Sequence, residues 1–226
     1  MAVVRILGID PGTQVVGFGC LEFEMSPTSR TRSGTPLALR GGNVVRVDGG
    51  ATNELRLLEA GVFRLGGRSV VVAQRLLSLA EQFRELVDRL RPDEIALEEA
   101  FAGKSVQAAL RIGEARGVVL AESARGGLVV HQFAPARIKR CVTGNGAASK
   151  DAVAAMVGHL VTGARSAATA KLPKDATDAV AVAFTRVEQR RSPLEMAASM
   201  VRADPGAMVA GVAIVEARTS NAPRGR

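Results

Sequence analysis

Residues 3–23 read VVRILGIDPGTQVVGFGCLEF, and this stretch decides the fold. Two apolar runs rich in β-branched residues, Val3–Asp10 and Val15–Phe23, flank the segment Pro11-Gly12-Thr13-Gln14. Pro and Gly favour tight turns, and two such runs joined by a short turn segment are typical of a β-hairpin. The sequence therefore predicts two antiparallel strands, of which the first ends in an acidic residue.

A third strand is predicted at Glu54–Leu65, following a segment at 24–53 that is rich in Ser, Thr, Gly, Pro and Arg. So long a run without regular structure is unusual inside a compact domain, so we interpret it as an insertion. The segment contains one short β-prone run, Asn43–Val47.

From Ser69 onward the apolar residues follow a helical period, and Arg91-Pro92-Asp93 ends this first helix. Strands are predicted at Glu94–Glu98 and Leu128–Phe133. The remaining helices are predicted at Ser105–Arg125, Pro135–Val142, Ser149–Val161 and Asp175–Gln189. Strands in hairpins followed by alternating helices and strands indicate an α/β layer fold with a mixed sheet.

Composition sets the class of protein. Of the 226 residues 47% are hydrophobic, which supports one domain with a sizeable core and excludes disorder throughout. No apolar run reaches the roughly 18–20 residues that cross a bilayer, and the N-terminal sequence does not resemble a secretion signal. Two cysteines, Cys20 and Cys141, are too few for a disulfide framework or a four-cysteine zinc site. We therefore expect a cytoplasmic protein with no membrane association.

Charge indicates the partner. The formal net charge is +8, which is most simply explained by a polyanion. Part of the excess lies in residues 190–226, which carry six arginines and three acids. Trp and Tyr are absent, which disfavours a protein that stacks many single-stranded bases.

Acidic residues occupy positions where they are costly for stability. Asp10 ends one apolar strand, Glu98 and Glu99 end another, and Asp175 and Asp178 open an otherwise apolar helix. Taken singly, each has an ordinary explanation as a turn residue, a solvated strand end or a helix-dipole acid. Gathered in one cleft they would need a cation, and carboxylate oxygens suit Mg²⁺ or Mn²⁺. An acidic metal site in a basic protein is the profile of a nuclease.

Five motifs occur in an order that resembles the RuvC family of bacterial Holliday-junction resolvases, in the RNase H-like superfamily. They are Gly8-Ile9-Asp10-Pro11-Gly12-Thr13, Ala96-Leu97-Glu98-Glu99-Ala100-Phe101, Gly113-Glu114-Ala115-Arg116-Gly117, Thr143-Gly144-Asn145-Gly146 with Lys150, and Asp175-Ala176-Thr177-Asp178-Ala179. The resemblance covers residues 1–23 and about 55–189. It implies an RNase H-like three-layer fold with a five-stranded mixed sheet flanked by helices.

The resemblance also implies a mechanism and its residues. Asp10, Glu98, Asp175 and Asp178 would be the catalytic and metal-binding carboxylates for two Mg²⁺ ions, with Mn²⁺ as a substitute. Phe101, Lys139 and Lys150 would contact DNA, and Glu99 would not bind metal. The substrate would be a four-way junction in recombination and DNA repair, cut by a homodimer through paired symmetric nicks. The implied partners are the RuvA and RuvB branch-migration proteins.

Three questions stay open at this level. The motif Gly8–Thr13 also resembles the phosphate loop of actin-like ATPases and sugar kinases, and a junction-binding scaffold without cleavage is a second alternative. The small residues of Ser105–Arg125 suit either dimerisation or packing against the sheet of their own chain. We assign 1–189 to the nuclease domain, with the insertion at 24–53, and 190–226 to a basic extension matched to nothing.

Overall fold

The computed structural model describes residues 2–25, 55–67, 69–99, 106–162 and 172–192. The chain divides into two compact units, Met1–Val187 and Glu188–Arg226. In the second unit the structure describes residues 188–192, where Arg191 pairs with Glu188 at 3.1 Å. The rest of this description concerns the first unit.

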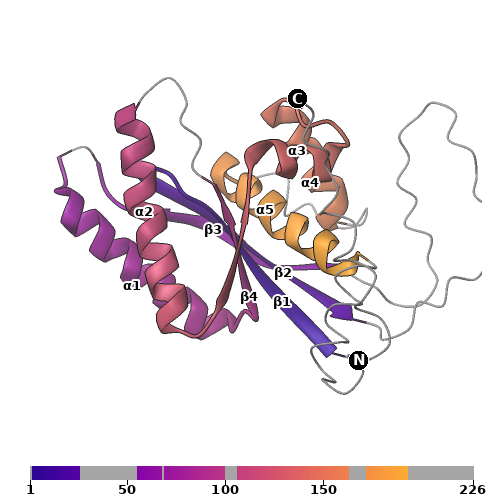
Figure 1. Cartoon of the computed structure of the whole chain (residues 1–226), viewed down its shortest axis with the longest axis horizontal. Helices are drawn as coiled ribbons and strands as arrows, with labels where there is room; N and C mark the ends of the chain where they lie inside the picture. The colour runs from indigo at the N-terminus through magenta and orange to yellow at the C-terminus, as the bar shows by residue number, and fades with distance from the viewer. Residues whose placement is uncertain (1, 26–54, 68, 100–105, 163–171, 193–226) are drawn as a thin grey trace, which may run out of the picture. The chain divides into compact units, whose positions relative to one another are not determined.

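Five strands form one mixed sheet in the order β3-β2-β1-β4-β5 (Figure 1). The strands are β1 (Ala2–Asp10), β2 (Val15–Met25), β3 (Arg56–Arg64), β4 (Glu94–Glu98) and β5 (Val129–Phe133). β1 and β2 pair antiparallel, as do β2 and β3, whereas β4 runs parallel to both β1 and β5. The predicted hairpin and the three other predicted strands are confirmed, while Asn43–Val47 lies outside the described residues.

The described helices are α1 (Val72–Leu90), α2 (Val106–Arg125), α3 (Pro135–Thr143), α4 (Lys150–Thr162) and α5 (Lys174–Arg191). α1 ends as predicted, because Arg91 takes the left-handed conformation at φ +48° and its N–H donates to the Val87 carbonyl. The last helix is two residues longer than predicted at its C-terminal end, since the periodicity fades among the polar residues there.

Alternating side chains give the sheet two cores, one on each face. Leu7 and Ile9 of β1 face the cluster that includes Leu79 of α1 and Val119 of α2. Ile6, on the opposite face, joins the cluster formed with α3, α4 and α5. The result is the three-layer α/β arrangement expected from the sequence (Figure 1).

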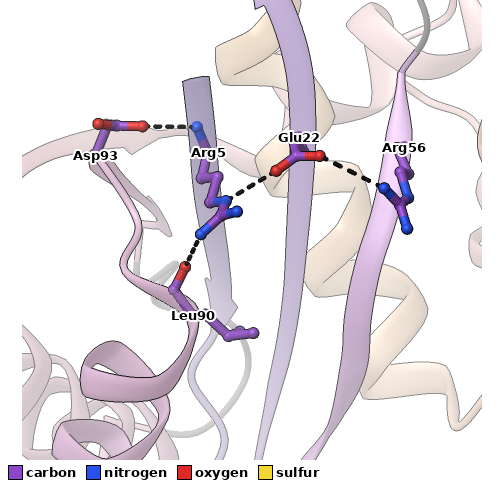
Figure 2. A network of polar contacts seen from close by, with 5 residues as sticks. All are labelled: Arg5, Glu22, Arg56, Leu90 and Asp93. Carbon is purple, nitrogen blue, oxygen red and sulfur yellow. Dashed lines mark hydrogen bonds and ion pairs between the residues drawn. The ribbon is translucent and has the colours of Figure 1, made fainter. Parts of the chain in front are cut away.

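A polar network ties together the strands at the end of the sheet where β4 begins (Figure 2). The Arg5 guanidinium donates to Glu22 at 2.9 Å and to the Leu90 carbonyl at 3.0 Å, and the Arg5 N–H donates to Asp93 at 2.8 Å. Arg56 of β3 approaches the other oxygen of Glu22 at 3.9 Å. The network joins three neighbouring strands without involving α5.

Among the described helices, none combines the length and apolar character that a bilayer-crossing segment requires.

Candidate active site

Two parallel strands bring the first pair of acids together. β1 and β4 pair in the register Ile9 with Leu97, so Asp10 and Glu98 end neighbouring strands at the same edge of the sheet. The alternation along β4 places Glu98 on the α5 face, because Ala96 belongs to the core cluster on that side. Glu99, the next residue, is exposed.

Helix α5 carries the other two acids and lies unusually close to the sheet. A Cβ atom added to Gly8 would overlap the Ala179 carbonyl oxygen, and one added to Gly17 would overlap that of Asp175. A Cβ atom at Gly19 would meet the Val180 side chain. These three glycines of β1 and β2, which we call the glycine platform, let the helix backbone approach the strands directly.

The glycine platform brings the acids of α5 close to those of the sheet. Gly17 pairs with Asp10 across β1 and β2, and the first turn of α5 stands over Gly17. Asp178 follows one turn later and lines the same pocket as Glu98. The structure therefore brings Asp10, Glu98 and Asp178 together, with Asp175 in the adjoining turn of α5.

Electrostatics show how strongly these carboxyl groups interact. Burial raises the pKa of Asp10 to about 8, and repulsion from Glu98 and Asp178 adds to the shift. The pKa of Glu98 is also raised, first by burial. The hydrogen bond between the two carboxyl groups raises the pKa of Asp10 further and lowers that of Glu98.

Two predicted lysines reach this site from separate helices. The Lys150 ammonium, at the start of α4, donates to Asp178 Oδ2 at 2.6 Å, and this bond raises the pKa of Lys150. Lys139, on α3, lines the pocket with Glu98, Lys150 and Asp178. Its positive charge partly opposes the rise in the pKa of Glu98. Phe101, the third residue assigned to DNA contact, lies outside the described residues.

The donor set fits divalent cations. Asp10, Glu98 and Asp178 offer hard oxygen atoms, and burial together with their mutual repulsion raises the pKa of Asp10. Within the described ranges, no three His, Cys, Asp or Glu side chains are already spaced as metal ligands. A divalent cation held by these carboxylates would offset their repulsion.

The glycine platform is the part of the site that the sequence analysis missed. Gly8 belongs to the motif Gly8–Thr13 and Gly17 to an apolar strand, and glycine inside a strand signals the close approach of another backbone. That signal was available, but it does not say which segment approaches.

Comparison with known proteins gives a consistent result. The family model for crossover junction endodeoxyribonuclease RuvC matches residues 37–186. The protein of that name from Chloroflexus aurantiacus is 36% identical over 181 residues, which cover 80% of this chain and 91% of the relative. The one from Halorhodospira halophila is 34% identical over 200 residues, covering 88% and 99%.

A solved structure agrees with the sequence matches. The structure of T. thermophilus RuvC in complex with a Holliday junction substrate superposes with a TM-score of 0.63 at 26% identity, covering 83% of this chain and 95% of that one. These matches decide against the actin-like ATPase considered from Gly8–Thr13. The chain belongs to the RuvC family of crossover junction endodeoxyribonucleases.

Proposed function

We propose that this chain resolves four-way DNA junctions by metal-dependent hydrolysis, with one nick in each of two strands of like polarity. The observation that carries the proposal is the pocket in which Glu98 of β4 and Asp178 of α5 meet Lys139 and Lys150. Acids that bind metal supply the chemistry for cutting a phosphodiester, and lysines beside them can bind the phosphate. The basic composition supplies the wider attraction to DNA.

Asp10, Glu98, Asp175 and Asp178 would hold two divalent cations, Mg²⁺ or Mn²⁺. Bound there, the cations would activate water for in-line attack on phosphorus and stabilise the leaving 3′ oxygen, giving 5′-phosphate and 3′-hydroxyl ends. Asp10 lies next to both Glu98 and Asp178 and would hold metal together with them. Its raised pKa means that metal binding displaces a proton from this carboxyl.

The two lysines would bind the phosphate around the bond that is cut. An ammonium has three donor hydrogens, so Lys150 can bind Asp178 and a phosphate oxygen at the same time. Lys139 approaches from α3 on the same pocket. Both would act on charge that grows in the transition state, and Phe101 would contact a base near the crossover.

A second copy of the chain would dock on the outer face of α2. Ala115 and Val119 of this helix are buried in the core, whereas Val106 and Leu110 are 75% and 65% exposed. Gly113 and Gly117 are exposed too, and a Cβ atom at either would meet no heavy atom within 4 Å. These glycines therefore do not pack against their own sheet, which supports the dimer interface, whereas Ala115 of the same helix does pack in its own core.

The exposed residues of α2 follow the spacing of a helix-pairing seam. Positions 106, 110, 113 and 117 recur at intervals of four, three and four residues, and we call Val106, Leu110, Gly113 and Gly117 the α2 seam. Small residues at its centre would let two helices approach closely. A homodimer built here would present two active sites to one junction, which paired nicks require.

The family resemblance extends the proposal to cellular partners. A junction resolvase would act with the RuvA and RuvB branch-migration proteins in recombination and DNA repair. A DNA substrate is consistent with activity in the cytoplasm, which we expect for this chain.

Junction cleavage is tested with a synthetic four-way junction and a linear duplex of the same arms, each incubated with Mg²⁺ or with EDTA. We expect paired nicks in the junction with Mg²⁺ and intact DNA in EDTA. The duplex should remain uncut under both conditions. Binding without cleavage would favour the scaffold alternative, and equal cutting of both DNAs would contradict the proposed substrate.

A further inference from the structure

A buried ion pair lies behind the active site, at the far end of α5. Arg186 of α5 is 3% exposed, and its Nε donates to Glu94 Oε2 at 2.7 Å. A second guanidinium nitrogen approaches the other oxygen of Glu94 at 3.4 Å, so the contact is a two-pronged fork. His131 of β5 lies 3.5 Å from the same carboxylate.

The glycine platform brings α5 close to the sheet, but it does not by itself fix one position of the helix along the strands. Ala179 and Ala183 face Gly8, so at this crossing small side chains meet a backbone without a side chain. Other residues of α5, among them Phe184 and Val187, pack in the core cluster that includes Ile6, and apolar contacts of this kind are non-directional. Arg186 adds a directional contact on the same helix.

The ion pair lies at the right distance to fix the position of α5 along β4. Asp178 and Arg186 are eight residues apart, which is about 12 Å along a helix. The residues of β4 that they approach, Glu98 and Glu94, are four residues apart, which is about 13 Å along a strand. α5 therefore runs antiparallel to β4. Asp178 and Glu98 lie together at one end, the Arg186–Glu94 pair lies at the other, and the two elements cover about the same length between them.

We infer that the Arg186–Glu94 pair is a positioning device that sets the register of α5 along β4 and so holds Asp178 beside Glu98. Removing two charges from water is costly, and a buried pair adds little net stability compared with apolar side chains. Its best-supported use is to specify one arrangement among several, which is what metal ligands from two separate elements need. The consequence for metal binding rests on the proposed function, whereas the register of α5 does not.

The test replaces both charges at once, with Arg186→Met and Glu94→Met in one protein, so that no buried charge is left unpaired. The matched control is Arg5→Met with Glu22→Met, which removes a pair between β1 and β2 that does not involve α5 (Figure 2). The measurements are the crystal structure in EDTA, the melting temperature in EDTA, and Mn²⁺ affinity by electron paramagnetic resonance.

We expect the Arg186/Glu94 double variant to melt close to wild type, to show α5 displaced along β4, and to bind Mn²⁺ about 10–100-fold more weakly. The Arg5/Glu22 control should bind Mn²⁺ as wild type does. Arg186→Lys keeps the positive charge but cannot make the two-pronged contact with Glu94. Its Mn²⁺ affinity should therefore lie between those of wild type and the double variant. If the double variant does not fold, the Mn²⁺ affinity of Arg186→Lys decides whether the inference holds.

The inference would be overturned if the Arg186/Glu94 double variant kept its Mn²⁺ affinity and the original position of α5. It would also be overturned if the Arg5/Glu22 control lost as much Mn²⁺ affinity as the double variant. Failure of the proposed function has a different signature. If wild type and Asp178→Asn bind Mn²⁺ alike, the metal site is wrong, and the position of α5 in the metal-free double variant still decides the role of the ion pair.

Discussion

The Asp10 carboxylate is needed by the proposed metal site, but burying it in ionised form lowers the stability of the metal-free protein. Its pKa is about 8 in the folded protein and 3.8 in a model peptide, with burial as the main cause. Between these values the folded state binds a proton that the unfolded state does not. The contribution of Asp10 to the stability of the metal-free protein therefore becomes less favourable as pH rises from about 4 to 8.

Asp10→Asn should stabilise the metal-free protein while abolishing cleavage. The advantage of the variant should grow between pH 5 and pH 8, by up to about 1.4 kcal/mol for each pH unit, because asparagine carries no charge to bury. Urea unfolding in EDTA at the two pH values measures this difference. A wild type that is the more stable protein at pH 8 would show that Asp10 is not strained by its neighbours.

For single residues, the sequence indicated which acids belong to the candidate site better than it indicated which side chains contact one another. Asp10 and Glu98 could be chosen because each ends an apolar strand, and the structure does place them side by side. The bond from Lys150 to Asp178 could not be predicted, because it depends on how α4 is placed against α5. Neither helix carries a sequence signal for the other.

Among the elements, α5 and the glycine platform decide the geometry of the site. Gly17→Ala should destabilise the protein by about 1–3 kcal/mol and strongly reduce cleavage, because the added methyl group overlaps the Asp175 carbonyl. The matched control is Gly67→Ala, where a Cβ atom meets nothing within 4 Å. Thermal melts and junction cleavage measure both effects. A Gly17→Ala protein as stable and active as the control would mean that α5 does not depend on this contact.

The α2 seam gives the second prediction for an element. Leu110→Asp places a charge at the centre of the proposed interface and should yield a folded monomer that nicks one strand at most. Leu77→Asp, at a 56% exposed position on α1, should remain dimeric and make paired nicks. Light scattering and a paired-nick assay separate the two variants. A dimeric Leu110→Asp protein with paired nicks would place the interface elsewhere.

Periodicity explains why the elements were predicted well. Helices such as Val72–Leu90 carry a clear period of 3.6 residues, strands such as Glu94–Glu98 are short apolar runs, and turn residues mark their ends. Periodicity does not show which side of a helix meets its own sheet when both sides are small and apolar. For that reason the sequence could not show that Gly113 and Gly117 lie on the exposed side of α2.

For the whole molecule, the question is how much of the chain the activity needs. Residues 193–226 contain four arginines and three acids, so their removal changes the net charge little. Deleting them should leave junction preference and Mg²⁺-dependent cleavage intact, because Asp10, Glu98, Asp178 and both lysines lie within the described unit. Titrations of junction and duplex at several salt concentrations check this. Loss of junction preference alone would make the C-terminal segment part of the recognition surface.

The central claim is that carboxylates from β1, β4 and α5 hold the metal that cuts a junction, and a pair of neighbouring residues tests it most directly. The measurement is the single-turnover rate of cleavage of a four-way junction in Mg²⁺ by Glu98→Gln and by Glu99→Gln, with junction binding measured in parallel. Glu98 faces Asp10 and Asp178, whereas Glu99 is exposed. The account predicts a loss of more than about a hundredfold for Glu98→Gln with binding retained, and a change of no more than about twofold for Glu99→Gln. An active Glu98→Gln protein, or an inactive Glu99→Gln protein, would contradict it.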